Sequence, residues 1–366
     1  MKKIFTWMLL VALTICLCGG CGSKGDTVVS STEEASTITY IDCLGREVEL
    51  PSKIEKIAAI DAFSGELMVM LGAGDQMVAC PQGVKSDVLL QEIYPDLSDV
   101  SVVQSGGTVN AEALLELQPD VVLLKYGLYI AEGEAEKLEK LDIPYLVIAY
   151  TDMEEQIDAI RLVGQVAGGS AEEKAEQICD YYQDTIDLAT EKKQQIPEEN
   201  QIRVYHSINQ TYRTDGTNSL GADWISAVGC VNCSVGQTLL AEGDGYFTTK
   251  EQIFVWDPDV IICNDSMAAE YFKTDEEWKG LRAVQDDKVY NIPISATRWG
   301  QQGSVETFFG MLWLGTTLYP EVYSDVDLKT EVCTFYDEVL GISIDDEMYD
   351  KILSGTGLRL GSSNIK

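Results

Sequence analysis

The positively charged side chains best suited to bind a small molecule lie in predicted loops, Arg213 and Arg298 in the second half of the chain and Lys125 in the first. Arg213 and Arg298 carry planar guanidinium groups, which recognise carboxylate or phosphate in a bidentate manner. His206 is the single histidine, and it can either ligate the metal centre of a bound complex or form a hydrogen bond. A bare zinc or manganese ion is normally held by several histidines together with carboxylates. These residues therefore suit a ligand with acidic groups and predict no metal site of the protein's own. The alternative is that each arginine forms a structural ion pair.

Aromatic side chains accompany these charges in the predicted loops. Large flat or apolar ligands are held by such groups through stacking and buried area. Roughly half of the aromatic groups are expected to pack inside the protein instead, since aromatic residues are buried on average. The predicted ligand contacts are Phe63, Tyr126, Tyr212, Arg213, Tyr246, Arg298 and Trp299.

Catalytic motifs are missing from the sequence. It contains no Ser-His-Asp set, no P-loop, no Gly-x-Gly-x-x-Gly after a predicted strand and no second histidine for a general acid–base pair. We therefore expect no enzymatic activity and no cofactor. A tethered enzyme of the chelatase or reductase type is kept as an alternative, as is a surface adhesin.

The net charge excludes nucleic acid as a partner. The 366 residues include 26 Lys and Arg against 60 Asp and Glu, which gives a formal charge of −34. Binding to phosphate backbones requires clustered positive charge. Apolar residues make up 45% of the chain, which is typical of soluble globular domains.

The N-terminal segment has the charge order of a secretory signal. Lys2 and Lys3 precede an apolar run that ends at Gly19-Gly20-Cys21, and this ending resembles a bacterial lipobox although Cys18 stands where Leu is usual. We predict a signal peptide over 1–20, lipid attachment at Cys21 and a polar tether over 21–37. The body would then lie outside the cytoplasm, touching the cell membrane only through its lipid. An uncleaved membrane anchor is the alternative.

Ten cysteines occur, and two of them form Cys230-x-x-Cys233. No second such pair and no histidine pair completes a zinc site. We interpret the pair as small buried thiols or one local disulfide.

An internal duplication organises the body of the chain. Segments 110–124 and 249–263 share a capping residue, a Glu in the first turn (Glu112 and Glu251), a Pro-Asp pair and a β-branched run, all offset by 139 residues. A strand, a loop and a helix precede each copy. Repeated units of this kind predict an α/β fold with two Rossmann-like lobes and mostly parallel sheets.

The predicted domain limits follow from this pattern. The first lobe spans 38–165, one long inter-lobe helix spans 166–195, the second lobe spans 196–354, and a polar tail covers 355–366. Gly168-Gly169 interrupts the helical periodicity, and Ser170 with Glu173 is predicted to restart it as a capping box.

Three motifs in this order resemble the substrate-binding lipoproteins of ABC importers for iron–siderophores, haem and cobalamin. They are D-x-x-G-R-x-V-x-L-P at 42–51, Gly-Gly at 106–107, and L-x-A-V-x-x-x-x-V-Y-x-I-P at 281–293. The resemblance covers roughly residues 37 to 340. It implies two lobes joined by one long helix, with the ligand in the cleft between them.

The same resemblance implies partners and a cargo. In the siderophore and cobalamin receptors, one surface Glu on each lobe docks onto the permease, and these positions fall on Glu112 and Glu251. They can instead serve only to stabilise their helices. The expected cargo is an iron complex (a siderophore or haem) or a corrinoid, delivered by a monomer to a permease and its ATPase. A molybdate-type oxyanion receptor is the alternative.

Overall fold

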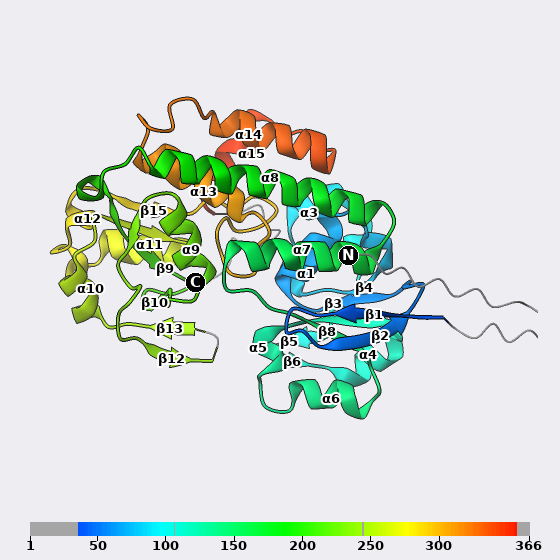
Figure 1. Ribbon diagram of the computed structural model, residues 1–366. Coiled ribbons are helices and arrows are strands. Elements are labelled where there is room, and N and C mark those ends of the chain that lie inside the picture. The colour runs from blue at the N-terminus through cyan, green and yellow to red at the C-terminus, as the bar shows by residue number, and fades with distance from the viewer. Residues whose placement is uncertain (1–35, 106, 244, 357–366) are drawn as a thin grey trace, which may run out of the picture. The chain divides into compact units, whose positions relative to one another are not determined.

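The computed structural model describes residues 36–105, 107–243 and 245–356 (Figure 1). The predicted signal peptide, Cys21, nearly all of the tether and most of the polar tail lie outside these residues. No helix in the described ranges is long and apolar enough to cross a membrane.

The first half of the body is built on a four-stranded parallel sheet of order β4-β3-β7-β8. The strands are β3 (Ile57–Ala59), β4 (Met77–Ala79), β7 (Val121–Lys125) and β8 (Tyr145–Ile148). β7 is buried from Val121 to Leu124, as expected of a strand covered on both faces. The helices that accompany this sheet are α1 (Ala62–Met70), α2 (Gln82–Lys85), α3 (Val88–Ile93), α4 (Ala111–Leu117), α5 (Tyr126–Tyr129) and α6 (Glu134–Lys140).

A second parallel sheet, of order β11-β9-β14-β15, supports the other half. Its strands are β9 (Arg203–Ser207), β11 (Val231–Asn232), β14 (Val260–Cys263) and β15 (Val289–Asn291). The accompanying helices are α9 (Leu220–Ala227), α10 (Lys250–Trp256), α11 (Ser266–Thr274), α12 (Arg282–Gln285), α13 (Thr307–Leu318), α14 (Leu328–Phe335) and α15 (Asp346–Leu353). The expected α/β fold with two lobes and mostly parallel sheets is confirmed.

The remaining strands pair in an antiparallel manner, and the remaining short helices are of the 3₁₀ or π type. These strands are the hairpin β1 (Thr37–Ile41) and β2 (Glu47–Pro51), the pair β5 (Gln104–Ser105) and β6 (Thr108–Val109), and the sheet β10 (Arg213–Thr214), β13 (Gly245–Phe247) and β12 (Leu240–Glu242). The short helices are η1 (Gly74–Gln76), η2 (Pro95–Asp99), η3 (Glu198–Asn200), η4 (Glu276–Trp278) and the π-helical η5 (Tyr336–Leu340).

The long helix α8 (Ser170–Lys193) lies close to the predicted inter-lobe helix 166–195, and a shorter helix, α7 (Met153–Ala167), precedes it. The two helices pack against each other, and α8 also contacts α9 and α13 (Figure 1). The break falls at Gly168 and Gly169, whose φ angles of 69° and 58° suit glycine. The predicted capping box is wrong, because Gly169 is the N-cap of α8 and no side chain caps that helix.

The duplication is visible in backbone detail. Asn110 accepts a hydrogen bond from the Ala113 amide at 3.1 Å, and Thr249 accepts one from the Gln252 amide at 3.2 Å. α4 and α10 then both end in a left-handed residue, Gln118 and Asp257, directly before the Pro-Asp pair. Because these caps are supplied by other residues, neither Glu112 nor Glu251 is needed as an N-cap.

A buried amide ties the connecting helices to the second half of the chain. Gln156 of α7 is fully buried, and its Nε2 donates to the Ser304 carbonyl at 2.8 Å. Its Oε1 accepts from the Tyr182 hydroxyl at 2.7 Å and from Thr307 Oγ1 at 2.8 Å. One side chain thus joins α7, α8 and the start of α13.

Gln156→Leu should lower the free energy of unfolding by roughly 2–4 kcal/mol, because it leaves two buried hydroxyls and a carbonyl without partners. Urea unfolding measures the loss. Gln165→Leu is the control, since Gln165 lies on the same helix but is exposed. A loss below about 0.5 kcal/mol for Gln156→Leu would show that the amide is dispensable.

Candidate ligand-binding site

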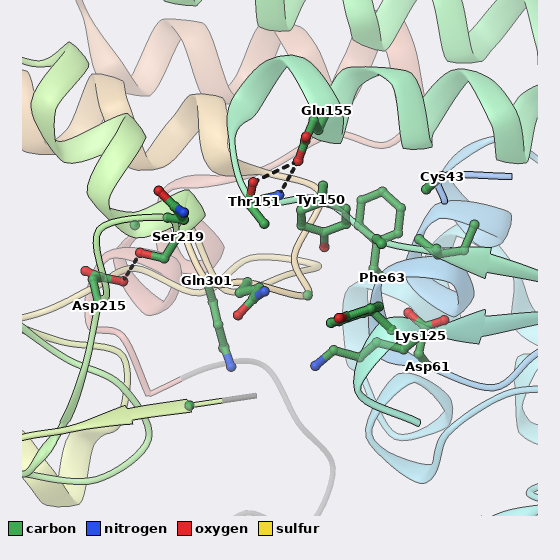
Figure 2. Close-up of a pocket in the computed structure, with 18 of the residues that line it drawn as sticks. Cys43, Asp61, Phe63, Lys125, Tyr150, Thr151, Glu155, Asp215, Ser219 and Gln301 are labelled. Atoms are coloured by element: carbon green, nitrogen blue, oxygen red, sulfur yellow. Dashed lines mark hydrogen bonds between the residues drawn. The ribbon is translucent and has the colours of Figure 1, made fainter. Parts of the chain in front are cut away.

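The structure contains a cavity of about 780 Å³ (Figure 2). Its lining includes the strand ends of both parallel sheets and the beginning of α7. Several of its polar lining residues lie at the carboxyl ends of parallel strands, including Asp61 after β3, Lys125 at the end of β7 and Asn209 after β9. Parallel α/β sheets characteristically place ligands there.

Asp61, Phe63 and Lys125 form the wall on the side of the first sheet (Figure 2). Asp61 caps α1 by accepting from the Ser64 amide at 3.0 Å and from Ser64 Oγ at 2.7 Å. Burial raises the pKa of Asp61 above its usual value, and the bonds to Ser64 and the charge of Lys125 oppose this shift. Phe63 packs against the ring of Tyr150, with ring centroids 5.0 Å apart.

The wall on the side of the second sheet contains an imidazole–carboxylate pair. His206 Nδ1 lies 2.9 Å from Asp215 Oδ2, and both side chains are almost completely buried. Asn232 Nδ2 donates to the same Oδ2 at 2.7 Å, and Ser219 Oγ donates to Oδ1 at 3.4 Å. Figure 2 shows Asp215 and Ser219 across the cavity from Lys125.

The loop 295–306 closes the space between these walls with Gln301, Gln302 and Gly303. A second cavity of about 500 Å³ shares these three residues as well as Asp61 and Lys125. Arg298 lines this second space and donates from Nη1 to Asn209 Oδ1 at 3.1 Å.

A buried carboxyl organises that loop. Glu306 has no exposed surface, and its Oε2 accepts from Ser295 Oγ at 2.6 Å and from the amide and hydroxyl of Thr297, each at 2.8 Å. Its Oε1 accepts from the Tyr336 hydroxyl at 2.6 Å. Burial raises the pKa of Glu306, although these donors act in the opposite direction.

The rim of the cavity on the side of the first sheet is apolar. Four large side chains that line it are substantially exposed: Ile41 at 63%, Leu44 at 41%, Tyr126 at 43% and Ile130 at 49%. Apolar groups gathered at the mouth of a cavity are typical of a surface that meets a partly apolar ligand.

The structure places the predicted ligand contacts in three different surroundings. Phe63, Tyr126, Arg213 and Tyr246 line the large cavity, and Arg298 lines the smaller one. Tyr212 and Trp299 line neither of these two cavities.

The rings of these two residues pack against other aromatic rings of the protein. Tyr212 packs against Trp278, with ring centroids 6.1 Å apart. Trp299 has no exposed surface, packs on Phe309 and donates from Nε1 to Ser295 Oγ at 2.7 Å. The predicted contact through Trp299 is therefore corrected, because its ring belongs to the buried core under the loop.

Several lining residues were not among the predicted contacts, notably Asp61, Lys125, Tyr150, Asp215 and Gln301. Asp61 and Lys125 stand directly after apolar strands, which is a usable signal. Asp215 gives no such signal, because its role depends on contacts with His206 and Asn232 that only the fold creates.

The remaining predicted residues lie elsewhere. Glu112 and Glu251 are exposed on the first turns of α4 and α10. Cys230 and Cys233 are buried free thiols, and burial raises their pKa values to about 12 and about 11. Of the two interpretations of this pair, the structure supports buried thiols.

Comparison with known proteins gives a consistent result. A family model described as periplasmic binding protein matches residues 57–296. The molybdate-binding protein MolA of Haemophilus influenzae is 23% identical over 322 residues, covering 81% of this chain and 88% of that protein. The iron(3+)-hydroxamate-binding protein YxeB of Bacillus subtilis is 26% identical over 168 residues, covering 46% of this chain and 47% of that protein.

Solved structures share the fold. Molybdate-bound MolA superposes with a TM-score of 0.74 at 21% identity, covering 84% of this chain and 99% of that one. A periplasmic solute-binding protein of Veillonella parvula gives a TM-score of 0.71 at 26% identity, covering 87% and 97%.

The raised pKa of Glu306 predicts a pH-dependent stability. The folded protein retains the proton at pH values where the unfolded chain, with a Glu pKa of about 4.3, has released it. Wild-type stability should therefore fall relative to Glu306→Gln as the pH rises from about 4 through the raised pKa, and then level off.

Urea unfolding of both proteins across this pH range measures the difference. Glu338→Gln, a surface exchange of the same type, controls for the loss of one carboxyl group. A stability difference between wild type and Glu306→Gln that stays constant with pH would contradict the expected shift.

Proposed function

The chain belongs to the periplasmic binding protein family, and we propose that it is the extracytoplasmic receptor of an ABC importer for an anionic organic chelate of a metal ion. The sequence resemblance to solute-binding proteins is confirmed at the level of this family. The narrower group of iron–siderophore, haem and corrinoid receptors remains our proposal for the cargo. The observation that carries it is a cavity of about 780 Å³ that combines cationic and apolar walls.

The charge of the walls favours an anionic ligand. In a chain of formal charge −34, Lys125 and Arg213 line the large cavity and Arg298 lines the smaller one. Acidic groups in the same lining have partners of their own. Asp42 forms a salt bridge with Arg46 at 2.8 Å, and Glu155 accepts from Thr151.

The size and the apolar rim favour an organic ligand. Cavities for drug-sized molecules have volumes of about 300–1,000 Å³. The exposed side chains of Ile41, Leu44 and Ile130 would meet carbon rather than water in a complex with such a ligand. A tetraoxo anion has no apolar surface to place against them.

A molybdate-type oxyanion is the second candidate cargo. The similarity to MolA over 81% of the chain supports it. Hydroxyl groups of Thr151 and Ser219, together with Arg213, line the cavity and are suited to hold an oxyanion.

Delivery to the permease and its ATPase is assigned to Glu112 and Glu251. Both are exposed, and they occupy equivalent positions on α4 and α10 of the two duplicated units. We further propose that the protein is a monomer attached to the membrane through lipid on Cys21, outside the cytoplasm.

Arg213→Gln should weaken binding of ferric citrate or haemin by about tenfold or more, because hydrogen bonds between charged groups contribute about 1.5–3 kcal/mol. Titration calorimetry on the purified protein measures this loss. Lys279→Gln removes one positive charge from the surface outside both cavities and should leave affinity unchanged. Equal affinities for wild type and Arg213→Gln would remove Arg213 from the site.

Simultaneous Glu112→Ala and Glu251→Ala should abolish uptake of the ligand by cells while leaving its dissociation constant unchanged, because docking and capture use separate surfaces. Transport assays and titrations measure the two quantities. Glu116→Ala with Glu270→Ala, which removes two other exposed carboxylates, is the control. Undiminished uptake in the first variant would exclude docking through these residues.

A further inference from the structure

The turn between β1 and β2 contains a hydrogen-bond network that the proposed function leaves unexplained. Asp42 is 4% exposed, and its Oδ1 accepts from the amides of Leu44 and Arg46, each at 3.0 Å. Its Oδ2 accepts from Arg46 Nε at 2.8 Å. Gly45 completes the turn with a φ of 76°, a conformation that favours glycine. The D-x-x-G-R part of the motif at 42–51 therefore builds one closed turn.

This turn covers the outer edge of the first parallel sheet. β8 is the last strand in the order β4-β3-β7-β8, so one side of its backbone needs partners from outside that sheet. The Val147 amide donates to Asp42 Oδ2 at 3.0 Å, and the Val147 carbonyl accepts from the Cys43 amide at 3.2 Å. Arg46 Nη2 donates to the Tyr145 carbonyl at 3.3 Å. The turn is thus bonded to a strand whose end lines the large cavity.

Arg46 also connects this turn to α5. Its guanidinium carbon lies 4.5 Å from the ring centroid of Tyr145 and 5.2 Å from that of Tyr129, the last residue of α5. A guanidinium group over an aromatic ring is attracted by the electrons of that ring. One side chain therefore holds together two segments that are far apart in the sequence.

Both segments present apolar side chains to the large cavity. Ile41 and Leu44 come from the turn, and Tyr126 and Ile130 come from α5 and the residue after it. All four are exposed, by 41% to 63%, and they form the apolar rim. Lys125 directly precedes Tyr126 and lines the same cavity, so cationic and apolar groups adjoin in this wall.

We infer that Asp42 and Arg46 are positioning residues of the ligand site, which hold the turn and α5 together so that the apolar rim selects chelates with an apolar face. This inference rests on the proposed function and narrows its cargo. Covering the rim with carbon removes apolar area from water, which is favourable in proportion to the area. A small polar chelate gains nothing there.

Two ferric ligands separate contact with the rim from capture of an anion. Haemin has a broad apolar macrocycle beside its carboxylates, whereas ferric citrate is small and polar. Ile41→Ser with Leu44→Ser should weaken haemin binding about tenfold or more and leave ferric citrate binding unchanged. Titration calorimetry measures both dissociation constants, and ferric citrate should displace haemin from one site per chain.

The matched control removes two exposed apolar side chains outside both cavities. Ile38→Ser with Val102→Ser changes residues that are 46% and 38% exposed and line neither cavity. This variant should bind haemin and ferric citrate like the wild type.

Arg46→Lys tests the positioning role without removing the positive charge. It changes the more exposed member of the pair and leaves the buried Asp42 in place. Because lysine lacks the planar fork that bonds and stacks at once, the affinity for haemin should fall about fivefold while that for ferric citrate is kept. Arg161→Lys, at an arginine that also has two carboxylate partners but lies outside both cavities, is the control. A purely structural role of Arg46 would leave the ratio of the two affinities unchanged.

The outcomes are distinct. Equal haemin affinities of the wild type and the variant at Ile41 and Leu44, or haemin that ferric citrate does not displace, would overturn the rim and leave the receptor function standing. Binding of ferric citrate without any binding of haemin would do the same. An unchanged affinity ratio in Arg46→Lys would overturn the positioning role. Failure of the wild type to bind haemin, ferric citrate or any ferric siderophore would overturn both the inference and the proposed function.

Discussion

The geometry of the site depends on one continuous apolar core that runs from the first parallel sheet to the second. Ile57 of β3 and Val204 of β9 belong to the same buried cluster, and α7, α8 and α13 fill the space between them. Gln156 fixes the register of these helices with directed hydrogen bonds. Because a packed core resists continuous deformation, the strand ends that carry the cavity are held at a set separation.

Buried carboxyl groups next to the cavities hold the segments that line them. Glu306 gathers the donors of Ser295, Thr297 and Tyr336, and so shapes the loop that carries Arg298 and Gln301. Asp215 does the same for His206. In both cases a buried carboxyl group holds a neighbouring segment that lines a cavity. The cationic residues at the cavity then act in a strongly acidic protein, where they provide a local site for negative charge.

Sequence patterns predicted the regular parts of this molecule well. The duplicated helix and strand units, the break at Gly168-Gly169 and the α/β fold all follow from short-range periodicity and turn chemistry. The site was harder to predict, because a loop position does not reveal where a side chain points. Trp299 follows Arg298 directly, yet its ring enters the core against Phe309 while Arg298 reaches the smaller cavity. Asp215 becomes important only when β9, β11 and the start of α9 are brought together.

The central claim is that the cavity receives an organic metal chelate. A thermal unfolding screen of the protein with haemin, cobinamide, cobalamin, ferric siderophores and molybdate tests it most directly, since a ligand that binds the folded state raises the melting temperature. We predict a clear rise with at least one of the chelates and little change with molybdate. A rise with molybdate alone would contradict the claim and identify the protein as an oxyanion receptor.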